Sequence, residues 1–353
     1  MNENATVGYW VSDSTPQKIT ALREIYFAFA CMHDVNFFVF SQKDVNVNDG
    51  TINGLFWENG EYVRKVTAMP TVFDMRLGGN LDRKFPDVLN TLKQSSYQVS
   101  RRGIGDKNDV AKWLLKEKTF ADYVIETQSY AQDSLKGFLA EHKTVILKPR
   151  SGSNGRGIYK LQQKSDDMVL VHYLADKTDE NIDSFIAEKH DMFVDGKYMM
   201  QTFVNSTALD GSPMDIRLNL ARGKDGQWGT SVAYFRFGGS SRVGTNMGKG
   251  QRARAVDVLN TCMYQLGDVE GRRVHTEFKN FAKTFPVHFQ KKLRFLVPEL
   301  AIDIGIDRDD NNKLKIFEVG ISPGTTGGNM LAVPGMNMQF YKHLLTLKSE
   351  GKL

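Results

Sequence analysis

Short apolar segments alternate with turns through the first hundred residues. The segment Asn36-Phe-Phe-Val-Phe-Ser41 is rich in aromatic and β-branched residues, which is typical of a strand, and the dipeptides Asp49-Gly50 and Asn59-Gly60 are typical of hairpin turns. The pattern predicts strands at 7–11, 36–41 and 70–74, a helix at 16–32, and a hairpin whose strands are 51–57 and 61–67. We therefore expect a small α/β domain over residues 1–105, and nothing in it indicates catalysis by itself.

The pattern changes at Asp106. Residues 106–118 and 134–142 have the apolar spacing of helices, and residues 144–148 form a predicted strand that leads directly into a glycine-rich loop. The C-terminal third alternates predicted strands with one long, basic, amphipathic helix at 276–296. No internal repeat or low-complexity segment separates these regions.

Composition restricts the class of protein. The chain has 353 residues, of which 41% are hydrophobic and 11% aromatic, enough for substantial cores. Two cysteines, Cys31 and Cys262, cannot supply a disulfide framework, so we expect a reduced, cytoplasmic protein. We expect neither a membrane span nor a signal peptide, because no apolar run approaches about 20 residues. A net charge of +5 is a mild excess over this length, and we expect no nucleic-acid partner.

The first chemical signal is the loop that follows Lys148. Glycines let the backbone turn so that successive N–H groups point into one concavity, which suits phosphate oxygens. The pattern is not that of a Walker loop, because no Gly-Lys-Ser/Thr closes it, and an ordinary glycine-rich turn remains an alternative. The loop consists of Ser151, Gly152, Ser153, Asn154, Gly155, Arg156 and Gly157.

The second signal is a group of basic residues around Asp215 and Arg217. These two residues are two positions apart on a predicted strand and therefore share one face. Arg217, Arg236, Arg242 and Lys249 would repel one another unless an anion lies among them, so a bound polyphosphate or carboxylate is one explanation. A structural salt bridge is the alternative for the Asp215–Arg217 pair.

The third signal is a hairpin with two carboxylates. Asp303 and Glu318 lie on predicted strands that are otherwise apolar and that are joined through residues 309–312. Carboxylates in such a setting need a cation or a donor, and Mg²⁺ binds few protein carboxylates when nucleotide phosphates complete its shell. Two carboxylates at a sheet edge, facing solvent, are the alternative.

In this order, the motifs resemble the ATP-grasp fold, and within it the YheC/YheD-type coat-associated proteins, with a weaker similarity to ribosomal-protein glutamate ligases. The resemblance implies an α+β (ATP-grasp) fold with an N-terminal α/β pre-ATP-grasp domain over residues 1–105. Residues 106–200 would form the first ATP-grasp subdomain and residues 201–353 the second. The motifs are Asp106-Lys107, Leu147-Lys148-Pro149 with Gly155-Arg156-Gly157, Gln201-Thr202-Phe203, Asp215-Ile216-Arg217, Asn246 with its following glycines, and Asp303 with Glu318.

The resemblance also implies ATP as the nucleotide and assigns residues to it. Lys107 and Lys148 would contact the α- and β-phosphates, residues 151–157 would close over them, and Asn246 would also contact the nucleotide. The backbone of the linking strand would read the adenine edge. That strand contains Gln201, Thr202, Phe203 and Val204.

The remaining charged residues would serve the transferred phosphate. Arg217 and Arg236 would steady the γ-phosphate and the acyl phosphate formed from it. Asp303 and Glu318 would hold Mg²⁺, and Asp215 would orient Arg217. The resemblance thus implies a carboxylate–amine ligase that joins amino acids or peptides through an acyl phosphate, a reaction that needs positioning more than a protein nucleophile.

One residue departs from the family pattern. The last motif of the family reads Glu-Val-Asn, whereas this chain has Glu318-Val319-Gly320, and glycine has no side chain to offer a second Mg²⁺. Two alternatives therefore stay open: a non-catalytic coat or assembly protein that binds a nucleotide, and a phosphotransferase that stops at a phosphorylated product. Basic residues near Arg252 and Arg254 favour an acidic substrate. The carboxylate and amine substrates are not determined, and a homo-oligomer is allowed because many relatives are dimers or tetramers.

Overall fold

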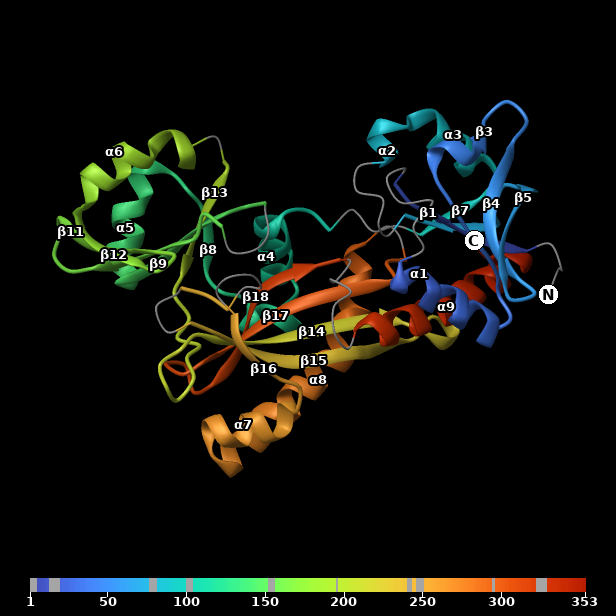
Figure 1. The fold of residues 1–353 in the computed structure, drawn as a ribbon. Coiled ribbons are helices and arrows are strands. Elements are labelled where there is room, and N and C mark those ends of the chain that lie inside the picture. The colour runs from blue at the N-terminus through green and yellow to red at the C-terminus, as the bar shows by residue number, and fades with distance from the viewer. Residues whose placement is uncertain are drawn as a thin grey trace.

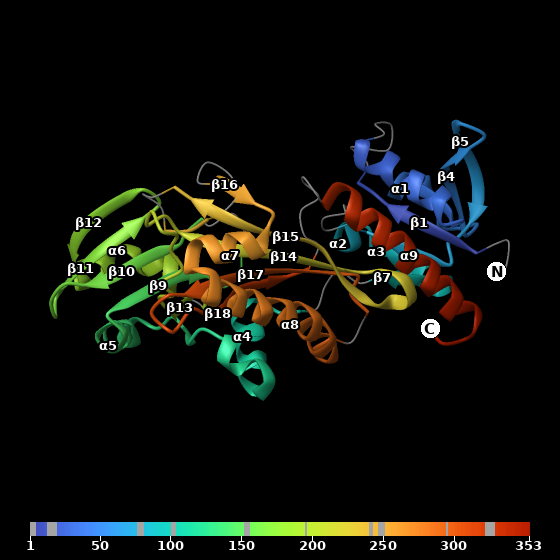
Figure 2. The same ribbon diagram turned by 90° about the horizontal axis from the view of Figure 1, so that it is seen from below.

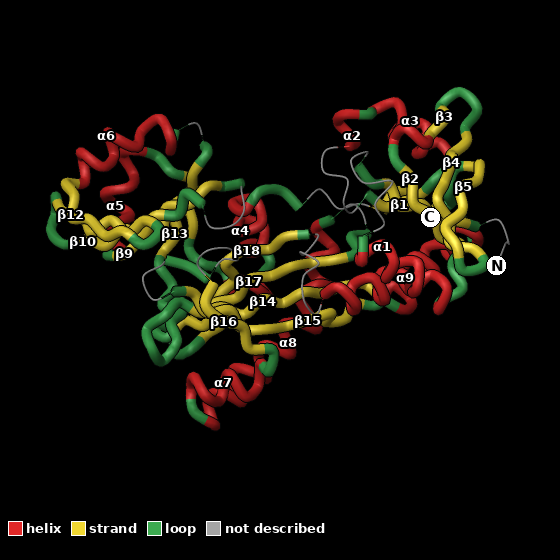
Figure 3. The backbone as a smooth tube through the Cα atoms, in the orientation of Figure 1, coloured by secondary structure: helices red, strands yellow, loops and turns green. Residues whose placement is uncertain are grey.

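The structure is a computed structural model, and it describes residues 5–12, 20–75, 81–99, 104–151, 156–194, 196–239, 243–245, 251–293, 296–321 and 329–353. Within these residues the chain forms three β-sheets, each covered by helices (Figures 1 and 3). This arrangement confirms the expected α+β class. The predicted loop residues Gly152, Ser153, Asn154, Gly155 and Asn246 lie outside the described residues.

The N-terminal sheet has a parallel centre and an antiparallel edge. Strands β2, β1, β6 and β7 are parallel, and the β4–β5 hairpin adds antiparallel strands where the sequence predicts it. The predicted first helix is found from Ala21 onward, and residues 13–19 lie outside the described part. The elements are β1 (Thr6–Trp10), α1 (Ala21–Met32), β2 (Asn36–Phe40), η1 (Gln42–Asp44), β3 (Val45–Asn46), β4 (Thr51–Glu58), β5 (Glu61–Ala68), β6 (Val72–Asp74), α2 (Leu81–Lys84), α3 (Pro86–Ser95) and β7 (Tyr97–Val99).

The last helix of the chain, α9 (Asn329–Ser349), lies beside α1 on this N-terminal sheet (Figure 2). Phe340, Tyr341 and Leu344 share one hydrophobic core with Tyr26 and Phe27 of α1. The local pattern does not predict α9, because its apolar residues do not gather on one face of the helix. The two ends of the chain therefore depend on each other for burial.

The second sheet, which we call the lid sheet, has the order β12-β11-β10-β9-β13-β8. Its adjacent strands are antiparallel, and α5 and α6 bury one face. The predicted strand 144–148 is confirmed as β9. The elements are β8 (Thr127–Ser129), α5 (Gln132–His142), β9 (Thr144–Pro149), β10 (Tyr159–Gln163), β11 (Met168–Tyr173), β12 (Asp176–Asn181), α6 (Ile182–Phe193) and β13 (Tyr198–Thr202).

The third sheet, which we call the central sheet, has the order β16-β15-β14-β17-β18. One face of this sheet packs on α4, α7 and α8. The phenylalanines of α8 at 278, 281, 285 and 289 fill the core between them. The predicted carboxylate hairpin is confirmed as β17–β18, and the predicted basic helix is found as α8, beginning earlier than expected. The elements are α4 (Lys107–Lys116), η2 (Lys118–Tyr123), β14 (Met214–Arg222), η3 (Lys224–Gly226), β15 (Trp228–Gly238), β16 (Gln251–Ala255), α7 (Val258–Leu266), α8 (Asp268–Lys292), β17 (Glu299–Asp307) and β18 (Lys313–Gly320).

Between them, the described residues contain no helix that is both long enough and apolar enough to cross a membrane.

Two helical glycines allow a matched test of packing. A Cβ added at Gly271 of α8 would lie 2.5 Å from backbone atoms of Met263 in α7, whereas one added at Gly137 of α5 would meet nothing within 4 Å. We expect Gly271→Ala to lower the free energy of unfolding by about 1–3 kcal/mol, because the two helices must move apart. Gly137→Ala should raise it by about 0.5–1 kcal/mol, because alanine restricts the unfolded chain. Urea unfolding of the two variants would contradict this packing if both changed stability in the same direction.

Candidate active site

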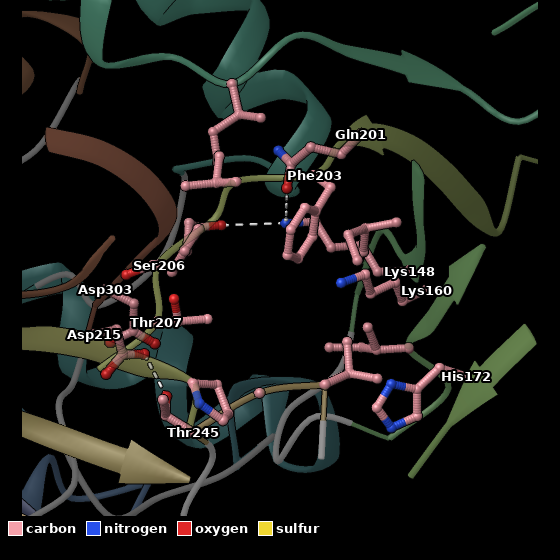
Figure 4. A pocket seen from close by; sticks show the side chains of 18 of the residues that line it. Lys148, Lys160, His172, Gln201, Phe203, Ser206, Thr207, Asp215, Thr245 and Asp303 are labelled. Carbon is pink, nitrogen blue, oxygen red and sulfur yellow. Dashed lines mark hydrogen bonds between the residues drawn. The ribbon is translucent and has the colours of Figure 1, made fainter. Parts of the chain in front are cut away.

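A cavity of about 370 Å³ lies between the lid sheet and the central sheet (Figure 4). Lys148 and Lys160 line it from the lid sheet, and Asp215, Asp303 and Glu318 line it from the central sheet. The chain passes from the lid sheet to the central sheet through residues 202–207, most of which line the cavity. The structure thus brings together Lys148, Asp215 and the two carboxylates of the predicted hairpin, whereas Arg217 and Arg236 do not line the cavity.

Lys148 is the central cation of this cavity. Its side chain is buried, and Nζ donates to Oε1 of Gln201 at 2.7 Å and to the carbonyl oxygen of Phe317 at 3.3 Å. Gln201 is fixed in turn, because its amide nitrogen donates to Oγ1 of Thr127 at 2.8 Å. Burial lowers the pKa of Lys148 to about 8; Lys107 lowers it as well, and Glu318 and Asp303 offset part of the effect. The structure therefore holds an ammonium that a bound anion would stabilise.

Two arginines and two aspartates form a compact group on the central sheet. Arg236 donates to both carboxylate oxygens of Asp215, at 2.7 and 2.5 Å, and Thr245 donates to the same carboxylate at 2.5 Å. Arg236 also lies 3.0 Å from Asp303, to which Arg217 is paired at 2.6 Å. Burial alone would lower the pKa of Arg236, but Asp303 and Asp215 raise it well above its ordinary value.

This group corrects two expectations. Asp215 was expected to orient Arg217, but it binds Arg236 instead, and Arg217 is held by Asp303. Arg217 and Arg236 were expected to need an external anion to offset their repulsion, but the two aspartates already balance their charge. Arg242 and Lys249 lie outside the described residues. The register of β14 with its neighbouring strands explains these ion pairs, because it places Asp215 opposite Arg236 and Arg217 opposite Asp303.

The second carboxylate is more accessible than the first. Glu318 lies opposite Asp303 in the register of β17 and β18, and 41% of its side chain is exposed, against 10% for Asp303. Oε2 of Glu318 is 3.4 Å from Nζ of Lys107, the first residue of α4. The side chain is thus placed between a cation and open space.

These donors fit Mg²⁺ only with help from a ligand. Asp303 and Glu318 are neighbouring oxygen donors, which is the chemistry that Mg²⁺ prefers. No group of three or more His, Cys, Asp or Glu side chains placed for a metal is found in the described part of the chain. Asp303 and Glu318 therefore fit an ion whose remaining ligands are phosphate oxygens and water.

The linking stretch after β13 borders the cavity with backbone as well as side chains. Thr202 N–H donates to the carbonyl of Glu126 and Phe203 N–H to that of Thr144. No hydrogen bond from the N–H of Val204 is found among the described residues. Of Thr202, Phe203 and Val204, it is therefore Val204 whose backbone donor is available to a ligand.

The described residues of the glycine loop, Ser151, Arg156 and Gly157, do not line this cavity, although Ile158 directly after the loop does. Gly157 has φ 73°, and a Cβ there would lie 2.5 Å from the hydroxyl of Tyr198, so glycine is required at this position. At the other end of the loop, Arg150 donates to Asp106 at 2.6 Å, and Asp106 is the N-cap of α4. Ser151 lies beside Arg150, away from the cavity that holds Lys148.

Several lining residues were not found from the sequence. Thr245 and Phe317 lie next to predicted motifs, but only the folded chain shows that they contact Asp215 and Lys148. Lys160, His172 and Lys177 also line the cavity from the lid sheet, and no motif marked them. Lys160 alone had a local signal, the alternation of Tyr159, Lys160 and Leu161, because β11 is apolar around His172 and β12 is polar throughout.

The family model described as YheC/D like ATP-grasp matches residues 97–346. The chain belongs to this ATP-grasp family. Endospore coat-associated protein YheD of Bacillus subtilis (strain 168) is 24% identical over 338 residues, which cover 90% of this chain and 71% of YheD. Endospore coat-associated protein YheC of the same organism is 27% identical over 228 residues, which cover 63% of this chain and 61% of YheC.

Two solved structures have the same ATP-grasp fold. D-alanyl-alanine synthetase A from Vibrio cholerae O1 superposes with a TM-score of 0.53 at 11% identity, covering 97% of this chain and 98% of that one. The ATP-grasp ligase PsnB, solved with a precursor variant, Mg and ADP, gives a TM-score of 0.53 at 12% identity, covering 98% and 99%. The structural likeness therefore extends over the N-terminal sheet as well as the two sheets around the cavity.

The low pKa of Lys148 predicts a pH dependence of stability. The folded pKa of about 8 lies below the ordinary value of 10.5, so the unfolded chain binds more protons between these pH values. The free energy of unfolding should then rise with pH across this window, by about 3 kcal/mol from this group alone. The free energy of unfolding of the wild type and of Lys148→Met should be measured with denaturant at pH 7.5 to 10.5. The difference between the two isolates Lys148, because the titration of all other groups contributes equally to both. In Gln201→Glu the added carboxylate should raise the pKa of Lys148, so the rise in stability should begin at higher pH. If the difference in free energy of unfolding between wild type and Lys148→Met did not change with pH, the low pKa of Lys148 would be contradicted.

Proposed function

We propose that this protein is an ATP-dependent, ADP-forming carboxylate–amine ligase that makes an amide or peptide bond on an amino acid or peptide. The observation that carries the proposal is the cavity in which buried Lys148 lies opposite Asp303 and Glu318. A cation on one wall and two carboxylates on the other suit a Mg²⁺-bound polyphosphate between them. The family and the fold support the same conclusion.

ATP would lie along the cavity from the linking stretch to the carboxylates. Val204 N–H would bind the adenine edge, and the neighbouring Phe203 and Thr202 border the same side. Lys148 and Lys107 would bind the α- and β-phosphates, with residues 151–157 closing over them. Lys148 now donates to a carbonyl of the other sheet, so an arriving phosphate would replace that contact with a stronger, charge-assisted one.

Asp303 and Glu318 would hold Mg²⁺, which would neutralise charge on the transferred phosphate. Neither arginine lines the cavity, but the side chain of Arg217 is 21% exposed, so Arg217 is the one that would turn toward that phosphate. Arg236 is 1% exposed and would act as a positioning residue, because it holds Asp303 and Asp215 in place.

The reaction would have two steps. A substrate carboxylate attacks the γ-phosphorus and ADP leaves, giving an acyl phosphate; an amine then attacks the acyl carbon, loses a proton, and releases phosphate. Both steps depend on positioning and charge neutralisation, which the cavity offers, and the glycine loop would keep water from the acyl phosphate. We further propose that residues 1–105 select the substrates and that an acidic substrate meets the basic residues near Arg254.

A second function has support of its own. Gly320 removes a potential metal ligand, and the relatives YheD and YheC are named for association with the endospore coat. A nucleotide-binding coat component without turnover would use the same cavity. Turnover assays separate this function from the ligase.

Nucleotide binding is tested by thermal unfolding with and without Mg-ATP. At 100 times the dissociation constant, ATP should stabilise the wild type by about 2.7 kcal/mol. Lys148→Met should abolish this shift, because it removes the buried ammonium, while Lys93→Met, on the exposed face of α3, should keep it. Absence of a shift in the wild type at millimolar Mg-ATP would overturn the proposed site.

Turnover is tested by ADP release from mixtures of amino acids and short peptides. Release that requires both a carboxylate and an amine supports the ligase. ADP release without an amine would indicate a phosphotransferase, and binding without release would indicate the coat component. Asp303→Asn should abolish release while the Lys93→Met control retains it.

Gly320 offers a gain-of-function test. A Cβ at this position would have its nearest neighbour, the carbonyl oxygen of Ala301, 3.9 Å away, so a larger side chain fits. Gly320→Asn should place an amide oxygen two residues beyond Glu318, on the same face of β18, and lower the Mg²⁺ concentration needed for half-maximal nucleotide binding severalfold. Gly320→Leu, of similar size but without an oxygen donor, is the matched control. Equal Mg²⁺ dependence in both variants would contradict a metal at this position.

A further inference from the structure

Three basic side chains form a row across the lid sheet, which we call the basic row: Lys160 of β10, His172 of β11 and Lys177 of β12. The register places Lys160 opposite His172 and His172 opposite Lys177, so the three side chains share one face. That face is the one turned to the cavity, and all three residues line it. Neighbouring strands are about 4.8 Å apart, so the row spans about 10 Å from Lys160 to Lys177.

The basic row lies apart from the cavity's carboxylates. Asp215 and Asp303 lie on the opposite side of the cavity from Lys160 and His172 in Figure 4, and Glu318 is on β18 beside Asp303. Within the described residues, neither Lys160 nor Lys177 forms an ion pair with a carboxylate. Asp179 is two positions from Lys177 on the same strand, but it is exposed and does not line the cavity. This end of the cavity is therefore electropositive.

Lys160 packs against an aromatic ring of the linking stretch. Its Nζ lies 3.6 Å from the ring centroid of Phe203, in the linking stretch. Burial lowers the pKa of Lys160, and the charge of Lys177 lowers it further, so the two ammonium groups repel each other across the row. An anion between them would relieve this repulsion and would gain two charge-assisted hydrogen bonds.

We propose that the basic row binds a phosphate group at the nucleoside end of the cavity, separate from the triphosphate that Lys148 and Lys107 would bind. The inference rests on the proposed nucleotide site, because Phe203 belongs to the stretch that would hold adenine. In dinucleotide-binding Rossmann folds, a carboxylate binds the hydroxyls of an unmodified ribose, whereas a basic residue accommodates a ribose 2′-phosphate. Here Lys160, His172 and Lys177 line this end of the cavity, whereas the hydroxyl residues Ser206 and Thr207 lie on the other side, with Asp215 and Asp303 (Figure 4).

The phosphate has two sources of the same chemistry: a ribose phosphate on the nucleotide, or a separate phosphate ion bound beside it. Calorimetry on the full chain distinguishes them with five probes, which are ADP, AMP, the adenosine 2′,5′- and 3′,5′-bisphosphates, and inorganic phosphate. A ribose phosphate is supported if either bisphosphate binds at least tenfold more tightly than AMP. A separate ion is supported if inorganic phosphate binds to the ADP-saturated protein while the bisphosphates bind like AMP.

Variants tie the effect to the row. Lys160→Met with Lys177→Met should remove the preference for the bisphosphate, or the binding of phosphate, and leave ADP affinity within about threefold. Lys164→Met, on the exposed turn after β10, is the matched control and should change nothing. Lys177→Met alone replaces an exposed side chain, so the fold is kept, and it should lose part of the effect.

Two outcomes would overturn the inference. One is that neither the bisphosphates nor inorganic phosphate binds as described although ADP binds, which leaves the proposed nucleotide site intact. The other is that Lys164→Met weakens phosphate binding as much as the double variant does, which indicates nonspecific charge attraction. Failure of ADP itself to bind would instead refute the nucleotide site on which the inference rests.

Discussion

The charge balance inside the central sheet is the constraint on which the site depends. Arg236 is almost fully buried, and it is kept there by the carboxylates of Asp215 and Asp303. Taking charges out of water costs several kcal/mol per ion, and these two carboxylates offset that cost for Arg236. Antiparallel pairing of β14 with β15 and β17 provides that geometry, and it leaves Asp303 at the floor of the cavity.

The opposite wall uses the reverse arrangement. Lys148 is buried, and among the described residues its direct hydrogen-bond partners are the neutral oxygens of Gln201 and Phe317, so its charge is poorly compensated. Its bond to Phe317 crosses from the lid sheet to the central sheet, which makes the same side chain a structural tie between the sheets and a ready partner for an anion. The charges on the central-sheet wall are thus balanced, whereas the wall formed by the lid sheet carries an excess of positive charge. The basic row extends the uncompensated wall toward the linking stretch.

Much of the fold and part of the site could be predicted from local signals. The hairpin turns at Gly50 and Gly60, the strand before the glycine loop and the β17–β18 hairpin are determined by neighbouring residues, and the structure has them as expected. Helix α9 could not be predicted in its place, because it is stabilised by α1, some 300 residues earlier in the chain. Gln201 was expected to act through its backbone, but its side chain holds Lys148, a contact that only the pairing of β9 with β13 creates.

The sequence by itself determined which chemical groups are present and their order: a lysine before a glycine loop, an Asp-Ile-Arg strand, and two carboxylates on a hairpin. Those signals depend on spacing within one strand or turn, where geometry follows directly from residue type. The tertiary structure decided which charges meet. Asp215 pairs with Arg236 and not with Arg217, and Lys160 joins His172 and Lys177 in one row, because sheet register brings together residues that no local pattern connects.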